Sequence, residues 1–252
     1  MKMYAVLSAI LLISCQGKKE KIFLSVEKNG LVMEGFATKD SLFTDTVFYY
    51  DSSRRLLRKD KFENGRMNGV SVDYYSNGQP SSISYYTNGI KNGDNSYFDT
   101  SGNCDYKDYY YYDLSVGSIV YFNKDGSPRR YFFVNLQNET LVDINYLAWS
   151  GVNSIDTKCI NFTTQVQRTG SVKKLFLFLY LLNPPRLSFR YSIIKKKRLS
   201  ENEFTDVMEI ENEFPFKKLI LPEWEADESY AVRLNVFDSL LNRQAVIIKD
   251  IN

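Results

Sequence analysis

The chain contains no histidine. Without an imidazole it has no Ser-His-Asp or Cys-His pair, no zinc cluster of the common histidine type and no imidazole acid or base near neutral pH. Paired carboxylates are still available for catalysis, because an acidic cluster around Trp224 contains Glu223, Glu225, Asp227 and Glu228. A solvated loop between two strands explains this cluster more simply. We therefore expect a protein that is not an enzyme and has no catalytic residues.

The chain also lacks a charge excess and a long apolar run. Its 32 Lys and Arg residues nearly balance 30 Asp and Glu residues, so nothing in the net charge of +2 draws it to nucleic acid. The apolar run from Met3 to Ile13 is well short of the ~20 residues that a membrane-spanning helix needs. Because this run follows Lys2 and ends in small residues, it is typical of a secretory signal.

The end of that run, Leu12-Ile13-Ser14-Cys15, resembles the lipobox of bacterial lipoproteins. The resemblance implies cleavage before Cys15, a diacylglycerol on its thiol and acylation, as by palmitate, of its new amine. Several acyl chains anchor a protein stably where a single chain is marginal. We expect residues 1–14 to be a signal peptide and 15–21 a lipidated tether, on the outer membrane of a bacterium, facing the periplasm or the surface. An ordinary signal peptide with an incidental cysteine is the alternative.

Cysteine is otherwise scarce, since only Cys104 and Cys159 remain. An oxidising compartment would allow them to pair. They fall in different predicted domains, however, which favours two unpaired, buried thiols. The pairing stays open at this point.

What the chain does contain is a 24-residue repeat. Four columns recur at that step: Gly69, Gly93 and Gly117; Gly78, Gly102 and Gly126; Tyr74, Phe98 and Phe122; and Tyr85, Tyr109 and Phe133. A fixed period of this kind is typical of architectures built from one repeated supersecondary unit. The content of 19 Tyr and 17 Phe favours strands as that unit.

Asn-Gly dipeptides predict how the repeated strands connect. They occur at 29–30, 64–65, 68–69, 77–78, 88–89 and 92–93. Because Asn-Gly supplies the positive φ angles of tight type I′ turns, these sites indicate a meander of short antiparallel strands.

A two-residue turn at 77–78 would pair Val70 with Tyr85, Val72 with Ile83, Tyr74 with Ser81 and Ser76 with Gln79. Paired residues share a face. One face would then be apolar, with Val70, Val72, Tyr74, Ile83 and Tyr85, and would need a cover. The other would carry Ser71, Asp73, Tyr75, Ser82, Ser84 and Tyr86, and a register slip of one residue would exchange the two faces.

The repeat pattern is aromatic-x-Asn-Gly-x-x-Asn-Gly, then an aromatic pair and a glycine, and it runs from Phe62 to Gly78 and from Tyr86 to Gly102. It resembles the MORN-variant repeats of bacterial proteins, some of which are grouped with a YwqK-like antitoxin family. The third copy departs, with Tyr112-Asp113 in place of Asn-Gly. The resemblance covers about half of the chain and implies an open, largely single-layered antiparallel sheet that serves as an interaction scaffold.

The remaining part, residues 151–252, does not contain the 24-residue repeat. Six strand-like runs are Val172–Leu182, Leu187–Lys195, Asp206–Ile210, Phe216–Leu221, Tyr230–Phe237 and Gln244–Ile251. The clean alternation of the last two resembles the final hairpin of immunoglobulin-like or fibronectin-like sandwiches. We therefore expect an all-β protein, with a repeat-built antiparallel meander sheet over 22–145 and an immunoglobulin-like β-sandwich over 151–252.

Two weaker motifs have simple explanations. Asp99, Ser101, Asn103 and Asp105 offer alternate oxygen ligands for calcium, but Gly102 is misplaced for a standard loop and no bidentate Glu follows, which favours a hairpin turn. The basic run from Lys195 to Arg198 suggests anionic lipid or a polyanion, but four charges at a strand end are usually solvated. We expect no cofactor and no metal.

Two functions of different classes remain. The first is a non-catalytic interaction or scaffold lipoprotein whose sheet binds another envelope protein. The second is a glycan-binding lipoprotein, because aromatic rings stack on sugar faces and the polar face carries a tyrosine ladder. The ladder comprises Tyr75, Tyr86, Tyr97, Tyr110 and Tyr121, and the simpler explanation for it is cross-strand stabilisation.

Overall fold

The computed structural model describes residues 21–148, 157–169, 172–197, 204–211, 216–221 and 228–251, which form an all-β fold. Cys15, Glu223, Glu225, Asp227 and the side chain of Glu228 lie outside this described part. The chain folds into two compact units. The first is Met1–Leu114 with Phe122–Gly126, and the second is Ser115–Tyr121 with Ser127–Asn252. The domain limits expected from the sequence, 22–145 and 151–252, remain a prediction.

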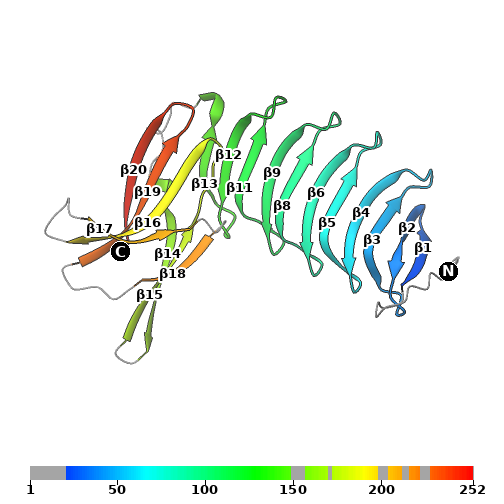
Figure 1. The fold of residues 1–252 in the computed structure, drawn as a ribbon, viewed down its shortest axis with the longest axis horizontal. Helices are drawn as coiled ribbons and strands as arrows, with labels where there is room; N and C mark the ends of the chain where they lie inside the picture. Colours follow the sequence, from blue (N-terminus) through cyan, green and yellow to red (C-terminus); the bar gives the residue numbers. More distant parts are fainter. Residues whose placement is uncertain are drawn as a thin grey trace. The chain divides into compact units, whose positions relative to one another are not determined.

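The repeat forms a meander of consecutive antiparallel strands, as the turn signals predict (Figure 1). A 13-stranded sheet has the order β1-β2-β3-β4-β5-β6-β8-β9-β11-β12-β13, with β7 on β6 and β10 on β9. In the first unit the strands are β1 (Ile22–Lys28), β2 (Leu31–Ala37), β3 (Phe43–Tyr50), β4 (Leu56–Glu63), β5 (Arg66–Tyr74), β6 (Pro80–Thr87), β7 (Ile90–Lys91), β8 (Gly93–Phe98), β9 (Cys104–Tyr111) and β10 (Leu114–Ser115).

The glycines of the repeat serve two different backbone geometries. Gly78, Gly102 and Gly126 have φ near +80° and end turns in which their N–H donates to the carbonyl three residues earlier. Gly69 and Gly93 have φ of 118° and lie inside the strand region. A bulged residue with positive φ bends and twists its strand, which is a position where glycine carries no steric cost.

The Asn-Gly dipeptides do not all form the expected turn. At 29–30, 64–65 and 88–89 both residues have positive φ, as a type I′ turn requires. In the third copy Tyr112 and Asp113 take the same geometry without a glycine. At 77–78 only Gly78 has positive φ, and the N–H of Tyr75 donates to the carbonyl of Gln79 across a longer loop.

The predicted register is confirmed for two of its four pairs, and the pair Ser76–Gln79 is wrong because the N–H of Tyr75 donates to Gln79 instead. Val70 lies opposite Tyr85 and Val72 opposite Ile83. The prediction for Tyr74 is wrong, because the sheet shifts register after Asp73 and Tyr74 lies opposite Pro80. The longer loop at Asn77-Gly78 supplies the extra residue that this bulge absorbs.

The first unit buries side chains on the face that the sequence predicts to be polar. A row of short side chains crosses the polar face from strand to strand, and all of its members are buried. It consists of Val47, Asp60, Ser71, Ser84, Asn95 and Asp108. We call this side the inner face. On the nominally apolar outer face, Val72 is buried at 6% exposure, whereas Val70 is 39% exposed and Tyr85 is 43% exposed.

The second unit contains β11 (Gly117–Phe122), β12 (Pro128–Val134), β13 (Thr140–Asn145) and seven further strands. β14 (Asn161–Thr169), β15 (Val172–Tyr180) and β18 (Phe216–Leu221) form one sheet in the order β14-β15-β18. A second sheet has the order β17-β16-β19-β20, with β17 at Phe204–Ile210, β16 at Leu187–Lys197, β19 at Glu228–Asp238 and β20 at Arg243–Ile251. All six predicted strands are confirmed, whereas β14 was not predicted.

One hydrophobic core joins the end of the meander to these two sheets. It includes Tyr131 and Phe133 of β12, Leu177 and Leu179 of β15, and Leu234 of β19. The connection between β15 and β16 is tied to the meander by hydrogen bonds. The N–H of Asn183 donates to the Tyr131 hydroxyl at 3.2 Å, and the Tyr146 hydroxyl donates to the Pro185 carbonyl at 2.6 Å. β12 and β13 are therefore structural parts of the second unit.

Candidate functional site

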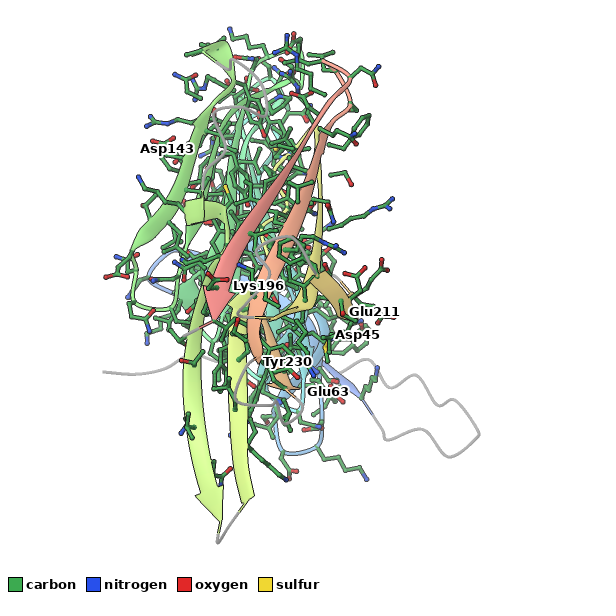
Figure 2. The ribbon with its side chains drawn as sticks, turned by 90° about the vertical axis from the view of Figure 1, so that its left-hand side faces the viewer. Asp45, Glu63, Asp143, Lys196, Glu211 and Tyr230 are labelled. Carbon is green, nitrogen blue, oxygen red and sulfur yellow. The ribbon has the colours of Figure 1, made fainter. Side chains whose placement is uncertain are left out.

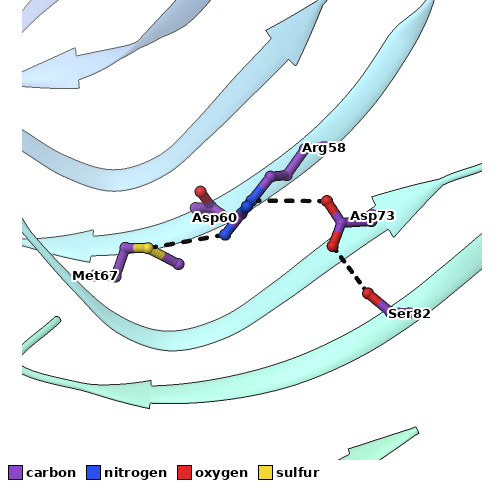
Figure 3. Close-up of polar contacts among 5 residues, drawn as sticks. All are labelled: Arg58, Asp60, Met67, Asp73 and Ser82. Atoms are coloured by element: carbon purple, nitrogen blue, oxygen red, sulfur yellow. Dashed lines mark hydrogen bonds and ion pairs between the residues drawn. The ribbon is translucent and has the colours of Figure 1, made fainter. Parts of the chain in front are cut away.

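The inner face of the first unit holds a continuous polar network (Figure 3). Arg58 on β4 donates through Nε to Asp60 at 2.7 Å and lies 3.8 Å from Asp73 on β5. The other oxygen of Asp73 accepts a 2.8 Å hydrogen bond from Ser82 on β6. Arg58 also contacts the sulfur of Met67 at 3.9 Å. The guanidinium thus contacts two strands directly and is linked to a third, β6, through Asp73.

Asp60 is the most deeply placed charge of this network, with 2% of its surface exposed. The Tyr49 side chain also hydrogen bonds to this carboxyl group. Burial of the tyrosine, together with the nearby Asp60 charge, raises the pKa of Tyr49 to about 12. The phenol therefore stays protonated above the pH at which an ordinary tyrosine ionises, and it remains able to donate to Asp60 there.

A second polar cluster lies further along the same face. Lys91 donates to the Tyr97 hydroxyl at 2.9 Å, and its ammonium lies 4.0 Å from the centre of the Tyr110 ring. Tyr97 stacks on Tyr106, with ring centres 4.2 Å apart and planes 11° from parallel. Burial lowers the pKa of Lys91. These long side chains flank the row of short buried ones.

Asn95 and Asp108 lie opposite each other beneath this cluster. They are 1% and 8% exposed. The amide nitrogen of Asn95 donates to the Gly93 carbonyl at 3.0 Å, but Oδ1 of Asn95 and Oδ1 of Asp108 are buried acceptors with no hydrogen-bond donor. Each of these two oxygens is an unpaired buried polar group, which is costly.

Burial raises the pKa of Asp108 from 3.8 to about 6, with the nearby Lys91 charge opposing the shift. Because the folded value exceeds the unfolded one, this carboxyl is least unfavourable below about pH 4 and costs stability as the pH rises through 6. The difference corresponds to about 3 kcal/mol above that window.

We expect Asp108→Asn to stabilise the first unit by up to about 3 kcal/mol at pH 7 and to flatten its pH dependence between 4 and 6. The amide removes the buried charge and offers an N–H to Asn95. Urea unfolding followed by circular dichroism at several pH values measures this. Asp105→Asn, an exposed residue on the same strand, is the control and should change little. A parent chain whose stability does not fall over that pH window would contradict the assignment.

The structure places the predicted tyrosine ladder in several settings. By register Tyr86, Tyr97 and Tyr110 lie on the inner face. The Tyr75 hydroxyl donates to the Phe98 carbonyl at 2.6 Å. Tyr121 belongs to the second unit, where its ring meets Phe132 edge to face. Tyr97 and Tyr110 already make the ring contacts described above, so parts of their surfaces are engaged within the sheet.

The outer face of the first unit presents apolar side chains to solvent. Phe48, Leu57, Val70 and Tyr85 lie on this face and are each more than a third exposed. Lysines lie among them, since Lys59 is opposite Phe48 and its ammonium is 5.6 Å from the centre of the Tyr74 ring. An exposed surface that mixes aromatic, aliphatic and cationic groups is typical of protein-binding sites.

The remaining candidates are occupied by local contacts. Asp99 accepts backbone N–H groups from Ser101 and Asn103 at 2.9 Å, which confirms a hairpin turn there. Lys196, labelled in Figure 2, pairs with Asp250. In the described part of the chain no group of three His, Cys, Asp or Glu side chains is arranged to hold a metal ion. Arg198 lies outside that part.

Cys104 and Cys159 do not form a disulfide with each other. Cys159 is buried as expected, whereas Cys104 is only partly buried. Their separation into different compact units agrees with the preference for unpaired thiols.

Comparison with known proteins adds no family, since no protein-family model matches the chain and no curated protein matches its sequence. Within the described residues, no helix has the length and apolar character needed to cross a membrane.

Proposed function

We propose that this protein is a membrane-anchored, non-catalytic interaction lipoprotein of the bacterial envelope. The observation that carries the proposal is the outer face of the first unit, where apolar side chains remain exposed. A second layer would normally cover such residues. A partner protein that docks on this face would supply that layer, as the resemblance to MORN-variant repeats also implies.

The anchor is proposed at Cys15, on the strength of the lipobox-like sequence from Leu12. It would hold the sheet near the membrane and raise the local concentration of the protein for partners there. The second unit is proposed to be an immunoglobulin-like sandwich. Its support is a shared core and the strand orders β14-β15-β18 and β17-β16-β19-β20, each made of antiparallel neighbours.

We expect Cys15→Ser to abolish incorporation of labelled fatty acid and to release the protein from the membrane fraction. A parent chain in the same host is the reference, and Cys104→Ser is the matched control because it removes a different thiol. Membrane association and label uptake that survive Cys15→Ser would contradict the anchor.

The partner can be sought with a photoreactive amino acid placed at Val70 in cells. A crosslink to one protein, absent when the same group replaces the exposed turn residue Asn88, would support the proposal. Glycan binding is the competing outcome. It would appear as a carbohydrate ligand on a glycan array that is lost on Tyr86→Ala without a loss of folding.

A further inference from the structure

The first strand of the meander leaves one edge open. Among the described residues β1 pairs with β2 alone. Its register runs from Ile22 opposite Ala37 to Lys28 opposite Leu31 without interruption. Each pairing from β2–β3 to β5–β6 contains a register shift, so β1–β2 is unusually regular.

Natural edge strands are generally blunted by proline, bulges or inward-pointing charges. β1 has no proline and no bulge over its seven residues, which read Ile-Phe-Leu-Ser-Val-Glu-Lys, and its two charges, Glu27 and Lys28, are confined to its C-terminal end. Val26 is 38% exposed at this edge. A straight, largely apolar edge with unpaired backbone groups is a template for another strand.

The direction of the open backbone groups follows from the hairpin. Lys28 and Leu31 close the two-residue turn at Asn29-Gly30, and such a closing pair exchanges both backbone hydrogen bonds. Every second residue does the same, so Lys28, Val26, Leu24 and Ile22 bond to β2. Phe23, Ser25 and Glu27 therefore direct their N–H and C=O groups to the open edge.

We propose that two copies of this chain pair through β1 in an antiparallel arrangement centred on Leu24. In this register Lys21 lies opposite Glu27 of the second copy, Ile22 opposite Val26, and Phe23 opposite Ser25. The residues with outward backbone groups face one another, which satisfies the alternation of an antiparallel ladder.

Charge complementarity favours this register, and it favours a second copy of the chain as the binding partner. The twofold axis places a lysine beside a glutamate twice, on the same face of the extended sheet. Lys21 already lies 3.7 Å from Asp45, but both side chains are more than two-fifths exposed, so the ammonium remains within reach of a second carboxylate. Opposed Leu24 side chains would continue the inner-face row across the axis. This contact uses the sheet edge and is separate from the proposed partner site on the outer face.

Sedimentation of the full chain in detergent, with Cys15→Ser as a lipid-free form, tests the pairing. The full sequence corresponds to 29.3 kDa, and we expect a species of twice the mass of the processed monomer at micromolar concentration. Glu27→Lys should weaken the dimer about tenfold, and Lys21→Glu should do the same, because each sets like charges opposite each other. The double variant Lys21→Glu/Glu27→Lys should restore the dimer.

Disulfide trapping checks the register independently. Leu24→Cys lies on the axis and should link two copies under mild oxidation, whereas Val26→Cys faces Ile22 and should not. Ser25→Pro removes an outward N–H and the hydroxyl bond from Ser25 to Glu34, but no backbone hydrogen bond to β2. It should dissociate the dimer while circular dichroism stays unchanged. A monomer at all concentrations, a failure of the charge swap to rescue, or equal trapping at both cysteines would overturn the proposal. The proposal would also be overturned if another protein, or another segment of this chain, paired with the edge of β1.

Discussion

Replacing Arg58 with Met is expected to destabilise the first unit by about 3–5 kcal/mol, because the substitution leaves the carboxylate of Asp60 buried without its cation. The Nε to Oδ1 distance is 2.7 Å, and Asp60 is 2% exposed although the Arg58 side chain is a third exposed, so the carboxylate is the buried member of the pair. Urea unfolding followed by circular dichroism measures the change in the free energy of unfolding.

The chain offers a matched control for this prediction. Arg55 pairs with Asp51 at the same 2.7 Å distance, but the arginine side chain is largely exposed. Arg55→Met should therefore cost less than about 1 kcal/mol. The double variant Arg58→Met/Asp60→Asn should recover most of the loss, since it removes the buried charge as well. Equal losses from both arginines would show that the inner face is solvated.

Replacing Phe133 with Ala is expected to cost the second unit about 3–5 kcal/mol, through the cavity left by a fully buried ring. The Phe133 ring meets Tyr180 edge to face, with centres 6.1 Å apart. Phe132→Ala, on the same strand but facing the other way, should cost about 1 kcal/mol. Hydrogen exchange of β15 and β16 amides reports whether the loss reaches the C-terminal sheets, as the shared core requires.

The same core predicts how truncating the chain from its N-terminus changes the unfolding of the second unit. A chain that begins at residue 115 should unfold cooperatively, whereas one that begins at residue 151 should not, because it lacks Tyr131 and Phe133. Cooperative unfolding of the shorter chain with undiminished stability would contradict the role of β12 and β13.

The sequence predicted strands well where turn chemistry or strict alternation marked them. The Asn-Gly turns and the runs from Val172 to Ile251 located most strands, and the pairs Val70–Tyr85 and Val72–Ile83 followed from counting residues across one turn. β14 was missed because Asn161–Thr169 is mainly polar, with only Phe162 and Val166 as large apolar side chains.

The sequence did not predict which face of the sheet is buried. Ser71, Ser84 and Asn95 are short polar residues that hydrophobicity assigns to solvent. They are buried because bulges such as the one at Gly69 bend the strands, and long side chains such as Arg58 and Tyr97 flank them. Burial here depends on sheet curvature, which the alternation of polar and apolar residues does not encode. The polar network was therefore found only in the structure.

We expect the outer face of the first unit to be exposed in the isolated protein and covered by a partner in the envelope. The most direct measurement is maleimide labelling of Val70→Cys in purified protein and in native membranes, with Asn88→Cys as the exposed control. We predict that Val70→Cys reacts readily when purified and is protected in membranes, while Asn88→Cys reacts in both. Equal labelling of Val70→Cys in the two settings would contradict the account.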